Sequence, residues 1–199
     1  KAVLSTFAAV AILCGALVCS LIFIYPSTMM QLSYDLGMDE ASIQYANTAY
    51  ERSGEQEIYY IAFATEVAIG TKDFASIEAC AQKLVQNTSF KAYCAEKDKA
   101  INVQGQYAQY YYGQLYAAKY KNGKTQEAVN GAFASLDGGF PVNNAVWVVL
   151  LAALNASDTQ SLEQISQKLD AANIDEAALS DAEKTYLGSI RSILQTQAD

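Results

Sequence analysis

The first 34 residues constrain this chain more than any other stretch of it. Lys1 is followed by 33 consecutive uncharged residues, and the next charged residue is Asp35. Within this span, residues 2–25 form an almost continuously apolar run of 24 residues, AVLSTFAAVAILCGALVCSLIFIY. At roughly 1.5 Å per residue, a helix of that length exceeds the ~30 Å hydrocarbon core of a bilayer. The run therefore predicts a transmembrane helix within residues 1–26.

A cleaved secretory signal is the alternative interpretation of the same run. The apolar stretch of such a signal is usually about 7–15 residues long and ends at a cleavage site with small residues. Here the run is longer, and it ends in Ile24-Tyr25-Pro26, which is a poor cleavage context. If the segment were cleaved, the remainder would be a secreted soluble binding protein.

Positive charge predicts the orientation of a membrane helix. Lys1 precedes the run, and no further lysine or arginine occurs until Arg52. The positive-inside rule then places the amino terminus in the cytoplasm. We accordingly expect a single-pass membrane protein whose residues 27–199 lie outside the cytoplasm.

The composition argues against an enzyme and against nucleic acid as a partner. The chain has no histidine, which removes the most frequent general base and metal ligand. Its 13 Lys and Arg residues against 21 Asp and Glu residues give a formal net charge of −8, and no basic stripe stands out for phosphate binding. There is no Cys-x-x-Cys spacing and no glycine-rich phosphate loop. We expect no catalytic residues, no cofactor and no metal site.

The four cysteines divide into two pairs. Cys14 and Cys19 lie in the apolar run and are explained as small apolar residues. Cys80 and Cys94 stand 14 residues apart, across an expected turn between helices. Antiparallel neighbours would bring them to similar heights, so a disulfide is feasible in an extracytoplasmic domain. Two buried thiols are the alternative.

Beyond Pro26 the sequence predicts an all-α chain, because apolar residues recur at spacings of three and four rather than alternating. A short pattern also returns: a small residue that stops a helix, then polar N-cap candidates, then an apolar run. Its copies start 33, 53 and 33 residues apart, at positions 37, 70, 123 and 156. A period near 33–34 with one insertion is typical of stacked helix pairs.

The expected helices show apolar residues at spacings of three and four and lie between the recurring turns. They cover residues 27–36, 39–53, 55–70, 73–87, 106–120, 143–153 and 181–197. The insertion at 89–102 would add a helix or lengthen the one that follows, and residues 137–141 would form a turn. Ser180 is the expected N-cap of the last helix, whose apolar side (Leu187, Ile190, Leu194) is typical of a terminal capping helix.

One copy of the pattern, Gly113–Pro141, resembles the tetratricopeptide-repeat family. The family pattern is W-x2-L-G-x2-Y, then A-x3-F, then P. The positions of the first part are taken in order by Gly113, Tyr116, Ala117 and Tyr120. Val129 and Phe133 stand for the A-x3-F pair, and Pro141 closes the copy. The resemblance implies that residues 27–199 form an α-solenoid of stacked antiparallel helical hairpins that binds a protein or peptide.

Six tyrosines occur within residues 106–120. At 100° per residue, three of them share one face of a helix (Tyr107, Tyr110, Tyr111) and three share the opposite face (Tyr112, Tyr116, Tyr120). In the family register Tyr116 and Tyr120 occupy packing positions, so the second group is expected in the core.

The first face leaves two interpretations open. In the geometry of the family it would look into a concave groove, so that a ligand would meet Tyr107, Tyr111, Gln114, Ala118 and Lys121. Alternatively, this face packs against the inserted segment 89–102. If the groove interpretation holds, Tyr107→Ala with Tyr111→Ala should weaken partner binding and spare the fold.

The leading functional hypothesis is a membrane-anchored adaptor or scaffold that binds another protein, such as part of a bacterial cell-envelope machinery. A self-assembling structural protein is the alternative, because the Ala, Gly and Ser residues of the apolar run permit close packing of identical helices. No strict G-x-x-x-G spacing accompanies them. The secreted binding protein is the third hypothesis.

Overall fold

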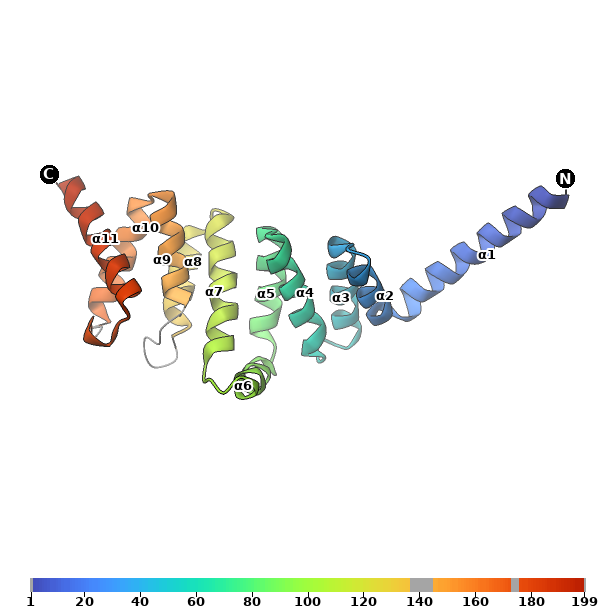
Figure 1. Cartoon of the computed structure of the whole chain (residues 1–199), viewed down its shortest axis with the longest axis horizontal. Coiled ribbons are helices and arrows are strands. Elements are labelled where there is room, and N and C mark those ends of the chain that lie inside the picture. The colour runs from blue at the N-terminus through green and yellow to red at the C-terminus, as the bar shows by residue number, and fades with distance from the viewer. Residues whose placement is uncertain (1, 137–144, 173–175, 199) are drawn as a thin grey trace. The chain divides into compact units, whose positions relative to one another are not determined.

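The computed structural model describes residues 2–136, 145–172 and 176–198, and within these ranges every regular element is a helix (Figure 1). The expected all-α class is confirmed. The chain divides into two compact units, Lys1–Thr71 and Lys72–Asp199, and each is considered by itself.

The first unit contains α1 (Ala2–Ile24), α2 (Pro26–Asp35), α3 (Asp39–Arg52) and α4 (Ile58–Thr71). Pro26 occupies the first position of α2, where its missing N–H costs no hydrogen bond. Helix α3 packs against both α2 and α4. The core of the unit is built mostly from small and branched apolar side chains that are almost fully buried: Met30, Ala46, Ala49, Ile61, Ala64 and Ala68.

Helix α1 covers the apolar run, and its side chains are exposed throughout residues 10–20. Ile12, Leu13 and Leu17 are 72%, 69% and 64% exposed. Within the ranges that the structure describes, no helix has the length and apolar character needed to cross a membrane. The transmembrane helix expected within residues 1–26 is therefore not supported here and stays a proposal.

The second unit contains the remaining helices, which pack on the next helix of the chain and, to a similar extent, on the next but one. They are α5 (Phe74–Gln86), α6 (Phe90–Ala100), α7 (Gln106–Lys121), α8 (Thr125–Ala134), α9 (Ala145–Ala156), α10 (Thr159–Ala171) and α11 (Asp181–Ala198), with a short 3₁₀ turn at Glu176–Ala178 before α11. Helix α7 contacts α5, α6, α8 and α9, while α8 also contacts α10 and α9 contacts α11. This pattern of contacts with the next helix and the next but one is the packing of stacked hairpins.

The apolar core of this unit extends from α7 to α11. Helix α9 is apolar on all sides and accordingly buried, as expected for a short core helix. Helix α10 instead buries one stripe at spacings of three and four, Leu162, Ile165 and Leu169. These residues and Val129, Val146, Leu150 and Ile190 form one cluster.

The helical hairpins are marked by residues with left-handed backbone. Four of the eight left-handed residues in the described ranges lie 35, 51 and 34 positions apart: Gly37, Lys72, Gly123 and Ser157. The other four, Gly54, Glu55, Asn102 and Gly105, lie in the turns before α4 and α7. In each of the first four cases the next helix begins two residues later. At three of these turns the residue after the left-handed one (Met38, Lys124 or Asp158) donates its backbone N–H to the carbonyl five residues earlier. The N···O distances are 2.8, 2.9 and 3.0 Å, and each bond satisfies a carbonyl at the end of the preceding helix. The four copies of the pattern thus share one turn geometry, with spacings of 35, 51 and 34 against the predicted 33, 53 and 33. The same hydrogen bond also forms at Glu55 and Val103, with N···O distances of 3.1 and 3.0 Å, so it is not confined to these copies.

The insertion forms a separate helix, α6, rather than an extension of α7. Asp98, near the end of α6, is 5% exposed, and its Oδ1 accepts a 2.9 Å hydrogen bond from the amide of Tyr107. Gly105 takes a left-handed conformation just before α7 begins. A carboxylate from the inserted helix therefore caps the start of the tyrosine helix.

A buried amide fixes the facing ends of α8 and α9. Gln109 on α7 is 9% exposed, and its Nε2 donates to the carbonyl of Ser135 at 3.0 Å. Its Oε1 accepts from the amide of Ala145 at 3.2 Å. Both ends of the side chain are thereby satisfied. The turn expected at residues 137–141, with Pro141 of the family pattern, lies outside the described residues.

The expected capping of the last helix is confirmed. The amide of Glu183 donates to Oγ of Ser180 at 3.3 Å, and the amide of Ser180 donates to Oε2 of Glu183 at 2.8 Å. This reciprocal pair is a capping box. Leu187 and Ile190 are buried, and Leu194 packs against the same cluster.

Tyr120, near the end of α7, is tied to the start of α10. Its hydroxyl donates a 2.6 Å hydrogen bond to Oδ2 of Asp158, the N-cap residue of α10. The hydroxyl of Ser161 donates to the same oxygen at 2.6 Å. Hydrogen bonds from Ser161 and then Tyr120 lower the pKa of Asp158. Burial, followed by the contact with Asp158, raises the pKa of Tyr120 to about 12.

The hydrogen bond between Tyr120 and Asp158 is expected to stabilise the fold only within a limited range of pH. The pKa of Asp158 is depressed, so its contribution is present above about pH 4 and is lost as the pH falls through the folded pKa. The pKa of Tyr120 is raised, so its contribution is present below about pH 10 and is lost toward about pH 12. We expect Tyr120→Phe to lower the free energy of unfolding by about 1–2 kcal/mol at neutral pH. In urea unfolding, a difference from the wild type that persists unchanged in strong acid would contradict this assignment.

Candidate functional site

The tyrosine helix meets the inserted helix through a cluster of aromatic rings centred on Tyr111. Tyr111 is only 1% exposed. Its ring lies 6.2 Å from Phe90 and 6.5 Å from Tyr93, both on α6. On α7 it lies 6.4 Å from Tyr107 and 5.2 Å from Tyr110, the latter edge to face. These distances and angles are those of favourable aromatic pairs, so Tyr111 joins α6 to α7.

The rim of this cluster reaches the surface. Tyr110 is 37% exposed, while Tyr93 and Tyr107 are half-buried. The ammonium of Lys97 lies 5.5 Å from the centre of the Tyr93 ring, within the range of a cation–π contact. We call Tyr93, Lys97, Tyr107 and Tyr110 the α6–α7 tyrosine surface.

The predicted groove residues are not brought together as one open face. Tyr111 and Ala118 are buried, Tyr107 and Gln114 are half-buried, and Lys121 is exposed. The groove interpretation is therefore wrong for Tyr111, and the alternative of packing against the inserted segment describes it. The physical reason is α6, which has no counterpart in the repeat and covers this part of α7.

The opposite tyrosine face lies in the core, as expected. Tyr120 belongs to the main apolar cluster, and Tyr112 and Tyr116 pack against it. The rings of Tyr112 and Tyr116 are stacked, with centres 6.3 Å apart and planes 10° apart. Gly131 on α8 makes room for Tyr116, because a Cβ at that glycine would lie 2.1 Å from a carbon of the ring.

The structure does not join Cys80 to Cys94, so the disulfide interpretation is not borne out by it. Both side chains are buried as thiols in neighbouring helices, α5 and α6. Burial, with the nearby charge of Asp98, raises the pKa of Cys94 to about 12. A thiol with that pKa stays protonated at neutral pH and is a poor nucleophile and a poor metal ligand.

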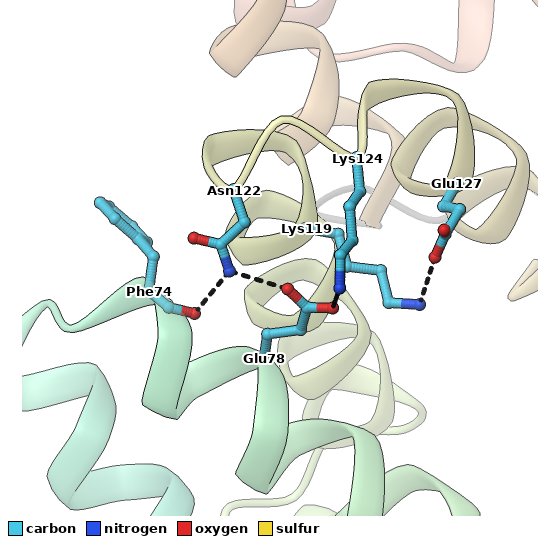
Figure 2. A network of polar contacts seen from close by, with 6 residues as sticks. All are labelled: Phe74, Glu78, Lys119, Asn122, Lys124 and Glu127. Carbon is cyan, nitrogen blue, oxygen red and sulfur yellow. Dashed lines mark hydrogen bonds and ion pairs between the residues drawn. The ribbon is translucent and has the colours of Figure 1, made fainter.

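A polar network lies at the other end of α7, next to Lys121 in sequence (Figure 2). Nδ2 of Asn122 donates to the carbonyl of Phe74 at 3.1 Å and to Oε2 of Glu78 at 2.7 Å. Nζ of Lys124 contacts the other oxygen of Glu78 at 2.7 Å. Although partial burial opposes it, these partners lower the pKa of Glu78. The network holds the α7–α8 turn against α5, which is a structural role.

A second group of exposed rings, in the first unit, was missed by sequence reasoning. Tyr34 on α2 and Tyr59 on α4 are 47% and 55% exposed. Their rings lie 5.3 and 6.4 Å from the ring of Phe63, and the Tyr59 ring lies 6.0 Å from that of Tyr60. The spacing of Tyr59, Phe63 and Glu66 would have placed these three on one face of a helix. Only the packing shows that this face is the outer one.

No catalytic arrangement emerges from these residues. In the described part of the chain, no group of three or more His, Cys, Asp or Glu side chains is placed to hold a metal ion. The displaced pKa values discussed above belong to helix caps, cross-helix contacts and buried thiols. No protein-family model, curated protein or solved structure matches the sequence.

Proposed function

We propose that the protein is a membrane-anchored helical-repeat adaptor that binds another protein or peptide at the cell envelope. The observation that carries this proposal is the α6–α7 tyrosine surface, in which accessible rings surround the buried Tyr111. Tyrosine offers a large, rigid contact area at low cost in conformational entropy and is enriched at protein interfaces. Tyr107 and Tyr110 are the residues expected to contact the partner.

The repeated turns support a tetratricopeptide-like architecture for residues 27–199. Among the left-handed turn residues, Gly37 and Lys72 lie 35 positions apart and Gly123 and Ser157 lie 34 apart, close to the repeat length of that family. The longer spacing, 51, contains α6. Helical repeats of this kind offer extended surfaces to protein ligands.

An anchor in the membrane is proposed from the sequence. The uncharged run of residues 2–25 has the length to span a bilayer, and Lys1 favours a cytoplasmic amino terminus. The exposed apolar side chains of α1, such as Leu13 and Leu17, are suited to a lipid environment. We expect the protein to stay with membranes during extraction at alkaline pH. A variant that lacks residues 2–25 should be released, and release of the full chain would count against the anchor.

Site-specific photocrosslinking in the native membrane tests the binding surface. A photoreactive amino acid at Tyr110 should yield one crosslinked partner, whereas the same group at the exposed Lys184 of α11 should not. Tyr107→Ala should reduce crosslinking from position 110 several-fold without changing the helical content. Equal products from positions 110 and 184 would overturn the proposal. A product that is only the protein itself would favour the self-assembling alternative.

A further inference from the structure

The exposed aromatic group of the first unit has properties that the α6–α7 tyrosine surface does not share. Its rings come from two helices, since Tyr34 lies on α2 and Tyr59, Tyr60 and Phe63 lie on α4. Phe63 is the central ring, with Tyr34 edge to face at 5.3 Å and Tyr59 at 6.4 Å. We call these four residues the Phe63 ridge. Its outer members, Tyr34 and Tyr59, are about half exposed and are therefore accessible to a ligand.

The charge around the Phe63 ridge is strongly negative. Residues 26–71 contain seven acidic residues and one basic residue, Arg52. Glu66 follows Phe63 by three positions and therefore lies on the same face of α4, Asp35 follows Tyr34, and Glu57 precedes Tyr59 by two. All three carboxylate side chains are exposed.

Two rings of the second unit have a cation of the chain itself beside them. Lys97 lies 5.5 Å from the ring centre of Tyr93, and Lys168 lies 5.6 Å from that of Phe133. The helices that carry the Phe63 ridge provide no such cation. Residues 2–51 contain no lysine or arginine, and α4 contains none either. Electron-rich ring faces beside carboxylates favour a cation supplied by a ligand.

We infer that the Phe63 ridge binds a basic, arginine-containing segment of another protein. Guanidinium groups would stack on the rings of Tyr34 and Tyr59 while pairing with exposed carboxylates such as Glu57. Arginine suits this surface better than lysine, because its planar group can stack and form paired hydrogen bonds at once. The inference does not depend on the α6–α7 tyrosine surface, since the two surfaces share no residue.

Peptide binding to the full-length protein in detergent tests the inference. The probe is a fluorescein-labelled peptide of repeated Arg-Gly-Ser, and the matched control peptide has Gln in place of Arg. We expect anisotropy to report saturable binding of the Arg peptide only. The affinity should fall at least several-fold between about 50 and about 300 mM salt, because exposed charges are screened.

Paired variants locate the binding site. Tyr59→Leu keeps an apolar side chain but removes the aromatic face, and it should weaken the Arg peptide roughly three- to tenfold. Glu57→Gln should weaken it by a similar factor. The matched controls are Tyr25→Leu, at a tyrosine outside both surfaces that is 54% exposed, and Glu163→Gln, at an exposed position of α10. Neither control should change the affinity.

Several results would overturn the inference. They are equal binding of the Arg and Gln peptides, no binding of either, or equal effects of Tyr59→Leu and Tyr25→Leu. A second copy of the chain on the ridge is the competing occupant. It would be revealed if Tyr59→Leu converted a dimer into a monomer in sedimentation while the Arg peptide failed to bind.

Discussion

Replacing Tyr111 by alanine is expected to destabilise the second unit by about 3–5 kcal/mol, because it removes a fully buried aromatic ring from the junction of two helices. The ring contacts Phe90 and Tyr93 on α6 and two further tyrosines on α7. Without it, α6 would lose the centre of its contact with α7. The loss approaches the whole stability of a typical domain.

Trp147 allows this loss to be measured in the second unit alone. It is the only tryptophan of the chain, and it is buried in α9. Its fluorescence during urea unfolding therefore reports on the second unit. The control is Tyr110→Ala, the adjacent but 37% exposed ring, which should cost about 1 kcal/mol or less. Similar losses for the two variants would show that Tyr111 is not the packing centre.

The same geometry changes what the double variant Tyr107→Ala with Tyr111→Ala should do. The groove interpretation expects weaker binding with an intact fold. Because Tyr111 is buried, we instead expect the double variant to unfold in the second unit. Tyr107→Ala with Tyr110→Ala is the better test of binding, since it removes the accessible rings and leaves the buried one.

Gly131→Ala is expected to destabilise the second unit by about 1–3 kcal/mol, although alanine favours helices over glycine. The new Cβ would lie 2.1 Å from Cε1 and 2.6 Å from Cζ of Tyr116. An aromatic ring cannot yield at its tip as a lysine can, so it must leave its position. Its stacking on Tyr112 would be lost at the same time.

Two comparisons separate this clash from a general effect of glycine substitution. Gly188→Ala on α11 meets nothing within 4 Å and should stabilise the protein by about 0.5–1 kcal/mol. In a variant that already carries Tyr116→Ala, Gly131→Ala should no longer destabilise, which appears as a coupling energy in a double-mutant cycle. Additive effects of the two changes would disprove the contact.

The helices could be predicted because their signals are local. Gly37 and Gly123 mark left-handed turns by their lack of a side chain, and Ser180 with Glu183 forms a capping box within four residues. Lys72 and Ser157 take the same left-handed conformation without being glycine. The predicted starts, residues 70 and 156, lie two positions before Lys72 and one position before Ser157. They are displaced because a lysine or a serine gives no steric indication of left-handed backbone.

The surfaces could not be predicted, because they depend on which helix covers which face. The periodicity correctly separates the two tyrosine faces of α7. Which of the two tyrosine faces is covered depends on where α6 packs. The position of an inserted helix cannot be read from the periodicity of the helix beside it. Likewise, Tyr59 and Phe63 look like core residues until the packing of α4 leaves Tyr59 exposed and Phe63 half-buried.

The contacts of α7 also have a consequence for folding kinetics. This helix touches α5 and α6, which precede it, and α8 and α9, which follow it. Each contact closes only a short stretch of chain, so little loop entropy opposes it, and rapid folding is typical of such low contact order. A nucleus centred on α7 would need few distant encounters. Changes in that helix would then slow folding, whereas changes in the peripheral α11 would chiefly accelerate unfolding.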